Sequence, residues 1–359
     1  MGIEFVNVTV DTSGLYTVKT RDYGTVAIIG DGGTGDDTPV KIGSYSEADA
    51  TFADTDLGKA IKLALKNGAA SVIAVDIGAP TLTLVENGLA SVESMNVQIV
   101  CLANIVETLA DTYVSTALTD HVAAAGTDRV AVFMLAKGED AATMPSAIGG
   151  LLAANNSRLF GVAHNSDNDV AAAVAGLLAG VKPWESPLLK GFTGVTQTTQ
   201  FTKTQIDALE TAQINVIVSP IHMSGPVFAL GSDYTQGTAA AGINFVDVRR
   251  TIDDISYKLK AGLTNPNVIG SLRINKTGLS ELSGIVTGIL TTAMAAEEID
   301  NFKVDIPVLN ALAKAESSRS TAEENLITTA RTTRNVDMAV EVEYSGSFHT
   351  IDIDLEITV

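Results

Sequence analysis

The chain has 359 residues, a formal net charge of −19, 46% hydrophobic residues and 18% charged residues. This composition is globular and excludes a largely disordered chain. The acidic balance argues against a nucleic-acid binder, because phosphate recognition requires clustered Lys and Arg. The single cysteine, Cys101, excludes an internal disulfide framework and a cysteine-based zinc cluster, and its apolar neighbours predict a buried thiol.

The N-terminus lacks the basic region and the apolar core of a secretion signal. The longest apolar runs, 170–181 and 285–296, are shorter than the roughly 20 residues that a spanning helix needs. We therefore expect synthesis in a cytoplasm, without a signal peptide and without direct membrane insertion.

The first half of the chain alternates apolar runs with helical segments. The expected buried strands are 24–30, 70–78, 96–104, 128–135 and 157–164. The expected helices are 46–67, 107–125, 141–155 and 169–181. Helices between near-continuous apolar strands indicate βαβ units and a mostly parallel sheet covered on both faces. The run KPWESP at 182–187 breaks this pattern, and a domain boundary is expected close to it.

The second half has a different pattern, typical of an α+β domain. The expected strands are 214–220, 243–248 and 302–308, and the expected helices are 204–213, 249–263, 279–299 and 320–331. The helix at 279–299 is strongly amphipathic with period 3.6. Ser320 and Glu323 have the spacing of a capping box.

The two ends of the chain are both predicted to be extended β-arms. The C-terminal segment alternates apolar and acidic residues over 336–344 and again over 351–359, which predicts a hairpin with one apolar face. The apolar positions of its second strand are Ile351, Ile353, Leu355, Ile357 and Val359. The N-terminal arm has apolar residues at Phe5, Val6, Val8 and Val10. Half-apolar terminal strands require a partner, which is either the chain's own core or another chain.

The loop GDGGTG at 30–35 has the glycine spacing of a dinucleotide-binding turn and follows a strand. A dinucleotide site also requires a helix that begins at the last glycine. Here Asp36, Asp37 and Pro39 follow, and no lysine follows the glycines as in a P-loop. We therefore expect a structural loop and no bound cofactor.

Metal-ligand and catalytic patterns are weak. Asn165, Asp167 and Asp169 have the alternate spacing of a calcium loop, but the central glycine and the later glutamate are missing, so a helix cap at Asp167 or Asp169 is the better interpretation. The histidines are scattered and are interpreted as structural: His121, His164, His222 and His349. No catalytic residue and no metal site is predicted.

Paired arginines, Arg249 and Arg250, begin a predicted helix. An anion clamp is one interpretation, but salt bridges to Asp253, to Asp254 or to another subunit are favoured. Lys258 and Lys260 on the same helix are further candidates for salt bridges between subunits.

Four blocks of sequence follow one another in a distinctive order: 23–78, 203–220, 243–290 and 330–359. The first contains YGTVAIIGDGG and a helix that closes on Asn-Gly; the third contains Val-Arg-Arg at 248–250 and Asn-Pro-Asn at 265–267. This order resembles contractile tail sheath proteins, which occur in phages with contractile tails and in related injection particles. The middle region, 79–202, carries no such signature.

The resemblance implies a structural subunit and not an enzyme. Sheath subunits form a homo-oligomer of stacked six-fold rings around an inner tail tube protein, between a baseplate and a tail terminator. Contraction drives the tube through a cell envelope and needs no cofactor. The resemblance thus implies a place in a virion tail or an injection particle, with terminal arms that add strands to neighbouring subunits.

The expected domain organisation has four parts. They are an N-terminal β-arm (1–17), an α/β domain (18–195), a C-terminal sheath core domain (196–335) and a C-terminal β-hairpin or arm (336–359). Two other functions stay open from the sequence: a non-contractile virion or secretion-assembly protein, and a Rossmann-like nucleotide-binding enzyme.

Overall fold

A computed structural model describes residues 21, 23–124, 128–197, 199–220, 222, 228–238, 242–347 and 349. The chain divides into two compact units. We call residues 22–254 with 345–359 the α/β unit, and residues 255–344 with 1–21 the α+β unit. Each is described by itself below.

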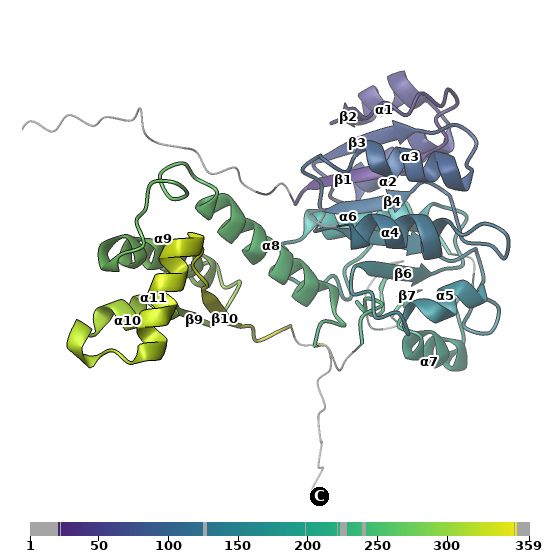
Figure 1. The fold of residues 1–359 in the computed structure, drawn as a ribbon. Coiled ribbons are helices and arrows are strands. Elements are labelled where there is room, and N and C mark those ends of the chain that lie inside the picture. Colours follow the sequence, from purple (N-terminus) through teal and green to yellow (C-terminus); the bar gives the residue numbers. More distant parts are fainter. Residues whose placement is uncertain are drawn as a thin grey trace, which may run out of the picture. The chain divides into compact units, whose positions relative to one another are not determined.

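An eight-stranded sheet forms the centre of the α/β unit, with strand order β2-β3-β1-β4-β5-β6-β7-β8 (Figure 1). The strands are β1 (Thr25–Gly30), β2 (Val40–Ile42), β3 (Ser71–Asp76), β4 (Ile99–Leu102), β5 (Val130–Met134), β6 (Leu159–Ala163), β7 (Asn215–Val218) and β8 (Ala229–Leu230). The six inner strands are parallel, and the edge strands β2 and β8 are antiparallel to their neighbours. The predicted mostly parallel sheet is confirmed.

Helices cover both faces of this sheet (Figure 1). They are α1 (Tyr45–Phe52), α2 (Asp56–Lys66), α3 (Leu82–Ser91), the π-helical turn η1 (Tyr113–Leu118), α4 (Thr119–Ala123), α5 (Ser146–Leu151), α6 (Val170–Gly180) and α7 (Lys203–Thr211). Along β1, Val26 and Ile28 belong to the cluster that contains α2 and α6, whereas Ala27 and Ile29 belong to the cluster that contains α3 and η1. Burial on both faces explains why the inner strands are apolar at most positions.

Several local predictions differ from the observed elements. The helix expected at 46–67 is two helices, because Ala53 has a φ of 46° and Thr55 caps the start of α2 through a hydrogen bond from the Gly58 amide. Strands β2 and β8 and helix α3 were not predicted. Cys101 in β4 is fully buried, as expected.

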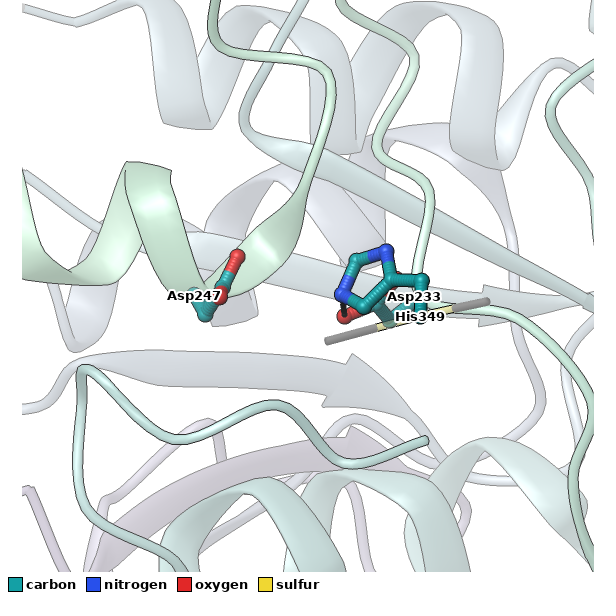
Figure 2. Close-up of side chains that lie close together, drawn as sticks. All are labelled: Asp233, Asp247 and His349. Carbon is teal, nitrogen blue, oxygen red and sulfur yellow. Dashed lines mark ion pairs between the residues drawn. The ribbon is translucent and has the colours of Figure 1, made fainter. Parts of the chain in front are cut away.

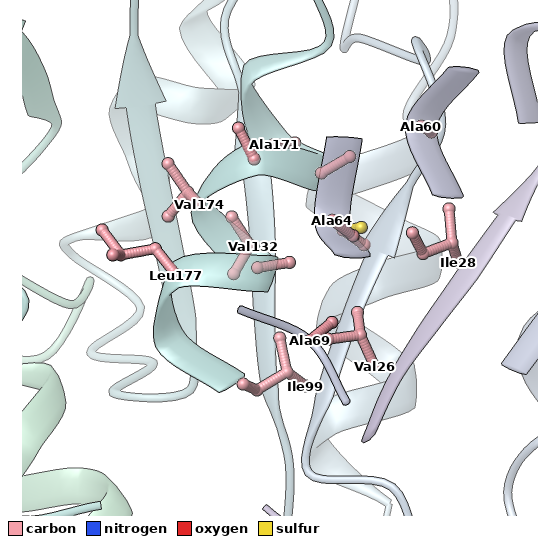
Figure 3. Close-up of a cluster of buried hydrophobic side chains, with 14 of the residues drawn as sticks. Val26, Ile28, Ala60, Ala64, Ala69, Ile99, Val132, Ala171, Val174 and Leu177 are labelled. Atoms are coloured by element: carbon pink, nitrogen blue, oxygen red, sulfur yellow. The ribbon is translucent and has the colours of Figure 1, made fainter. Parts of the chain in front are cut away.

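Helices α2 and α6 approach each other through glycines. A Cβ atom at Gly176 of α6 would lie 2.3 Å from the carbonyl oxygen of Ala64 in α2, and one at Gly68 would lie 2.9 Å from the Cα of Gly180. Figure 3 shows small side chains, such as Ala171 of α6, in this cluster above the sheet. Small residues therefore allow two helices to pack closely over the same face.

The domain boundary lies later than the sequence predicts. Residues 196–254 belong to the α/β unit, because β7 pairs with β6 and β8 pairs with β7. Asn215 supports this extension, since its side-chain amide donates to the carbonyls of Gly161 (3.0 Å) and Tyr234 (2.8 Å). The unit boundary falls inside helix α8 (Val246–Leu263), which begins where the sequence predicted a strand.

The α+β unit contains helices and a two-stranded antiparallel sheet. Its elements after α8 are α9 (Lys276–Ala295), β9 (Asn301–Asp305), α10 (Pro307–Ala313), the 3₁₀ turn η3 (Glu316–Ser318), α11 (Thr321–Thr333) and β10 (Ala339–Glu343). The capping box of Ser320 and Glu323 at α11 is confirmed. Strand β10 pairs with β9, and the predicted hairpin partner of β10, 351–359, lies outside the described residues.

Among the described residues, a single helix, α9, has the length and mean hydropathy of a membrane span. One stripe of its apolar side chains packs within the α+β unit. Val286 and Leu290 contact the cluster beneath β9 and β10, and Leu279 contacts the cluster around α10 and α11. These contacts bury one stripe of α9, and 28% of its apolar window is buried among the described residues.

The glycine contact between α2 and α6 gives a testable expectation. Gly176→Ala should lower the free energy of unfolding of the α/β unit by about 2 kcal/mol, because the added methyl group overlaps the Ala64 carbonyl. Urea denaturation followed by the fluorescence of Trp184, the one tryptophan in the chain, measures this unit.

Gly150→Ala in α5 is the matched control, because nothing lies within 4 Å of the added Cβ. It should leave stability unchanged or raise it by about 0.5–1 kcal/mol. Equal stability of the two variants would contradict the packing argument.

Candidate functional site

The glycine loop at 30–35 is folded around the carboxylate of Asp76, at the end of β3. The amides of Gly32 (2.8 Å) and Thr34 (2.9 Å) and the Thr34 hydroxyl (2.6 Å) donate to this carboxylate. The amide of Gly78 donates to it as well (2.9 Å). Burial tends to raise the pKa of Asp76, but these hydrogen bonds outweigh it and lower the pKa to about 2.

This arrangement disfavours a dinucleotide site. The loop amides that would hold a pyrophosphate already hold an internal carboxylate. A Cβ atom at Gly32 would lie 2.6 Å from the Cγ of Asp76. Gly32 is therefore required by close packing against Asp76, which supports the prediction of a structural loop.

A pocket of about 380 Å³ lies near the carboxyl ends of β4 and β6, where open α/β sheets often bind ligands. Its lining contains Asp169 together with Asn104 and three lysines of α2: Lys59, Lys62 and Lys66. Burial is the largest effect on Asp169 and raises its pKa to about 6, against the opposing hydrogen bonds of backbone amides. A carboxyl group with such a pKa could serve as a general acid or base.

The hydrogen bonds of Asp169 give it a structural task instead. One carboxylate oxygen accepts the amide of Ala172 (2.9 Å) and caps α6, and the other accepts the amide of Asn104 (2.7 Å) after β4. The predicted cap at Asp169 is confirmed. Asp169 thus ties the end of β4 to the start of α6, and each of its carboxylate oxygens accepts a backbone amide.

The paired arginines of α8 are engaged within the α/β unit. Arg249 pairs with Asp253, which also receives a two-pronged contact from Arg158 at 2.6 and 2.9 Å. Arg250 donates to the carbonyl of Val181 (3.1 Å) after α6. Because Asp253 is 2% exposed, the Arg249 pair is an internal contact of this unit.

Lys258 and Lys260 lie on the part of α8 that belongs to the α+β unit. Lys258 pairs with the fully buried Glu298. Salt bridges between subunits stay a prediction for all four residues: Arg249, Arg250, Lys258 and Lys260. Because Arg249, Arg250 and Lys258 already make internal contacts, each would have to bind another subunit through its further N–H groups.

The predicted arm residues lie outside the described residues. They are Phe5, Val6, Val8, Val10, Ile351, Ile353, Leu355, Ile357 and Val359. What the structure describes is the two-stranded sheet of β9 and β10, in which Val340 pairs with Val304. Within the described part of the chain each of these strands has a single partner, so the sheet has two open edges.

The four histidines have different environments in the structure. His121 and His164 are buried, and burial followed by the charge of Arg129 lowers the pKa of His121 to about 4. His222 is exposed. His349 lies beside Asp233 and Asp247, with potential ligand atoms of all three within 4.8 Å of one another. Local spacing could not reveal this group, because its members come from distant segments.

The sequence matches no protein-family model and no curated protein. Its fold is similar to a chain of the anti-feeding prophage helical sheath in the contracted state, with 15% identity and a TM-score of 0.67 over 100% of this chain and 99% of that chain. The chain has the fold of contractile tail sheath proteins. The resemblance inferred from the sequence is therefore confirmed at the level of the fold.

Two further solved structures have a similar fold. A chain of the anti-feeding prophage baseplate, six-fold symmetrised, is 16% identical with a TM-score of 0.68 over 100% of both chains. The sheath tail protein of Desulfitobacterium hafniense is 14% identical with a TM-score of 0.61, over 84% of this chain and 93% of that one. The mostly parallel sheet and the separate β9–β10 sheet are thus consistent with a sheath fold.

The buried carboxyl of Asp169 predicts a pH dependence. Its folded-state pKa of about 6 lies above the ordinary value of 3.8, so the protonated form favours folding and this contribution is lost as the pH rises from about 4 to 6. The unfolding free energy of the wild type minus that of Asp169→Asn should therefore fall by roughly 2–3 kcal/mol between pH 4 and pH 7, because only the wild type loses stability over this range. Each pKa unit is worth about 1.4 kcal/mol.

Urea denaturation with Trp184 fluorescence at several pH values measures this difference. Asp167→Asn removes one charge from the more exposed end of the same loop and controls for the loss of a negative charge. A difference between wild type and Asp169→Asn that is constant from pH 4 to 7 would refute a raised pKa at Asp169.

Proposed function

We propose that this chain is the structural subunit of a contractile tail sheath. The observation that carries the proposal is the similarity of fold, over the full length, to a chain of a contracted helical sheath. The subunits would stack as six-fold rings around an inner tail tube protein and contract to drive the tube through a cell envelope. The six-fold symmetry of the similar baseplate chain's assembly is consistent with such rings.

A mechanical function without an enzymatic step fits the geometry of the glycine loop. Asp76 occupies the amides that a nucleotide phosphate would need. The work of contraction would then come from the lattice, in which the extended arrangement of subunits is metastable and the contracted one is more stable. This proposal disfavours the alternative of a Rossmann-like nucleotide-binding enzyme.

The sheet of β9 and β10 is the proposed acceptor for terminal arms of neighbouring subunits. An isolated two-stranded sheet is marginally stable in water, and an open edge can pair with an added strand. The inner face of this sheet already packs on apolar residues of α8 and α9, through Phe302, Val304 and Val340. An added strand with the alternating pattern of 351–359 would extend the sheet and its apolar face together, and the apolar N-terminal arm could pair with the other open edge.

The remaining features of the proposal concern location and partners. The assembled sheath would belong to a virion tail or an injection particle and would meet a baseplate and a tail terminator at its ends. The subunit would be made in the host cytoplasm. Main-chain hydrogen bonds between arms and acceptor sheets can persist during rigid-body motion of subunits, which suits a lattice that changes its pitch.

Deletion of 351–359 should abolish polymerisation and leave a folded α/β unit. The reason is that the deleted strand would supply main-chain hydrogen bonds and an apolar face to the next subunit. Negative-stain electron microscopy of the purified full chain should show hollow tubes or rings, and the truncated chain should show dispersed particles with an unchanged circular dichroism spectrum.

Two matched full-length variants separate the faces of the arm. Ile353→Ser with Leu355→Ser alters the apolar face and should also prevent tubes, whereas Asp352→Asn with Asp354→Asn alters the acidic face and should preserve them. Long tubes from the truncated chain would contradict the arm function. A wild-type chain that forms neither rings nor tubes would contradict the sheath function.

Assembly should improve as ionic strength rises. Each subunit carries a net charge of −19, so a packed lattice brings many like charges together. The screening length falls from about 10 Å at 0.1 M salt to about 3 Å at 1 M, which weakens repulsion between subunits but not apolar burial. Light scattering across this range of sodium chloride measures the effect, with the truncated chain as the baseline.

The opposite trend would identify different lattice forces. Scattering that falls steadily with salt would mean that attractive ion pairs, with Arg249, Arg250, Lys258 and Lys260 as candidates, control assembly instead of net repulsion.

A further inference from the structure

We propose that Asp233, Asp247 and His349 form a binding site for a divalent transition-metal ion of the Zn²⁺ class. The inference concerns the α/β unit, which contains all three residues, and does not rest on the proposed sheath function. Figure 2 shows that the side chains come from three segments: the loop after β8, the first turn of α8, and the C-terminal segment.

The distances suit a shared ion better than a simple ion pair. Nε2 of His349 lies 3.4 Å from Oδ2 of Asp233. A charge-assisted hydrogen bond would bring such atoms to about 2.7–2.9 Å. Two ligands on a tetrahedral ion with bonds of about 2.0–2.1 Å lie about 3.3 Å apart, which is close to the observed separation. Ligand atoms of all three residues lie within 4.8 Å of one another, so binding of one ion would draw the ligand atoms together until each lies about 2.0–2.1 Å from it.

The chemistry of the donors also fits. One imidazole nitrogen and two carboxylate oxygens form a ligand set that Zn²⁺ and similar ions accept, with water in a remaining position. The Nε2 atom of His349 is buried and makes no hydrogen bond with any residue that the structure describes. A nitrogen in this situation can direct its lone pair at a metal ion.

Neighbouring groups hold the ligands in place. The Ser186 hydroxyl donates to Oδ2 of Asp233 (2.5 Å), and the Val248 amide donates to Oδ1 of Asp247 (2.7 Å). The ring of Phe245 contacts the His349 ring edge-on, with centroids 4.5 Å apart. Supporting hydrogen bonds and ring contacts of this kind orient the ligands in metal sites.

Charge and burial favour a cation at this position. Asp233 and Asp247 are each 1% exposed, and two buried carboxylates in proximity favour a positive charge between them. The positive end of the α8 dipole opposes a cation, and the carboxylate of Asp247 in the first turn offsets this effect. A bound ion would fasten His349, and with it the start of the predicted strand 351–359, to the α/β unit.

The test uses the purified full-length chain, stripped of metal with EDTA and dialysed. Calorimetric titration with Zn²⁺ should give one ion per chain. His349→Ala should weaken binding by at least tenfold, whereas His222→Ala, which removes an exposed histidine, should bind as wild type does. Substitution with Co²⁺ should give the intense visible bands of tetrahedral coordination in wild type and in His222→Ala, and weak bands in His349→Ala.

Three results would overturn the proposal: no Zn²⁺ binding by wild type, equal binding by His349→Ala, or an octahedral Co²⁺ spectrum in wild type. If the wild type does not bind Zn²⁺, His349 and Asp233 form an ion pair only. Thermal melting of the metal-free proteins controls for folding, and the His349 side chain is partly exposed (24%), so the variant should fold. If His349→Ala melts at a lower temperature than the wild type, two other measurements test the site. Asp233→Asn should weaken Zn²⁺ binding, and the wild-type Co²⁺ spectrum should show tetrahedral coordination.

Discussion

The α/β unit depends on the contact between the backbones of α2 and α6. Gly176 lies against the Ala64 carbonyl with no room for a methyl group, and Gly68 meets Gly180 in the same way. This close approach lets both helices cover one face of the sheet, so that α6 is buried along almost its whole length. With α6 in this position, Asp169 at its start reaches the end of β4. One packing constraint therefore fixes a helix, the sheet face beneath it and a loop at the carboxyl edge.

That carboxyl edge is where α/β proteins usually bind ligands, but in this chain it is stabilised from within. Asp76 accepts the amides of the glycine loop, and Asp169 accepts amides from α6 and from the end of β4. In both cases a carboxylate of the chain takes the position that a phosphate or substrate carboxylate would take in a binding protein. A mostly parallel sheet covered by helices on both faces does not by itself imply a ligand, since the site, and not the fold, determines chemistry.

The α+β unit differs in that its sheet has only two strands among the described residues. Two strands, β9 and β10, lie on apolar residues of α8 and α9, and each has one strand partner in the described part of the chain. After β10 the chain returns to the α/β unit, where His349 packs on Phe245 beside Asp233. His349 therefore packs against the α/β unit immediately before residues 351–359, the strand that is proposed to pair with a neighbouring subunit.

The sequence by itself determined the features that depend on local patterns. Apolar runs between helical segments predicted the mostly parallel sheet, Ser320 and Glu323 predicted a capped helix, and the residues after the glycines predicted a structural loop. Only the tertiary structure decided that β7 and β8 extend the first sheet, that β10 pairs with β9, and that His349 meets Asp233 and Asp247. The physical reason is that periodicity and capping act between residues a few positions apart, whereas strand pairing and side-chain clusters join distant segments whose partners no local pattern specifies.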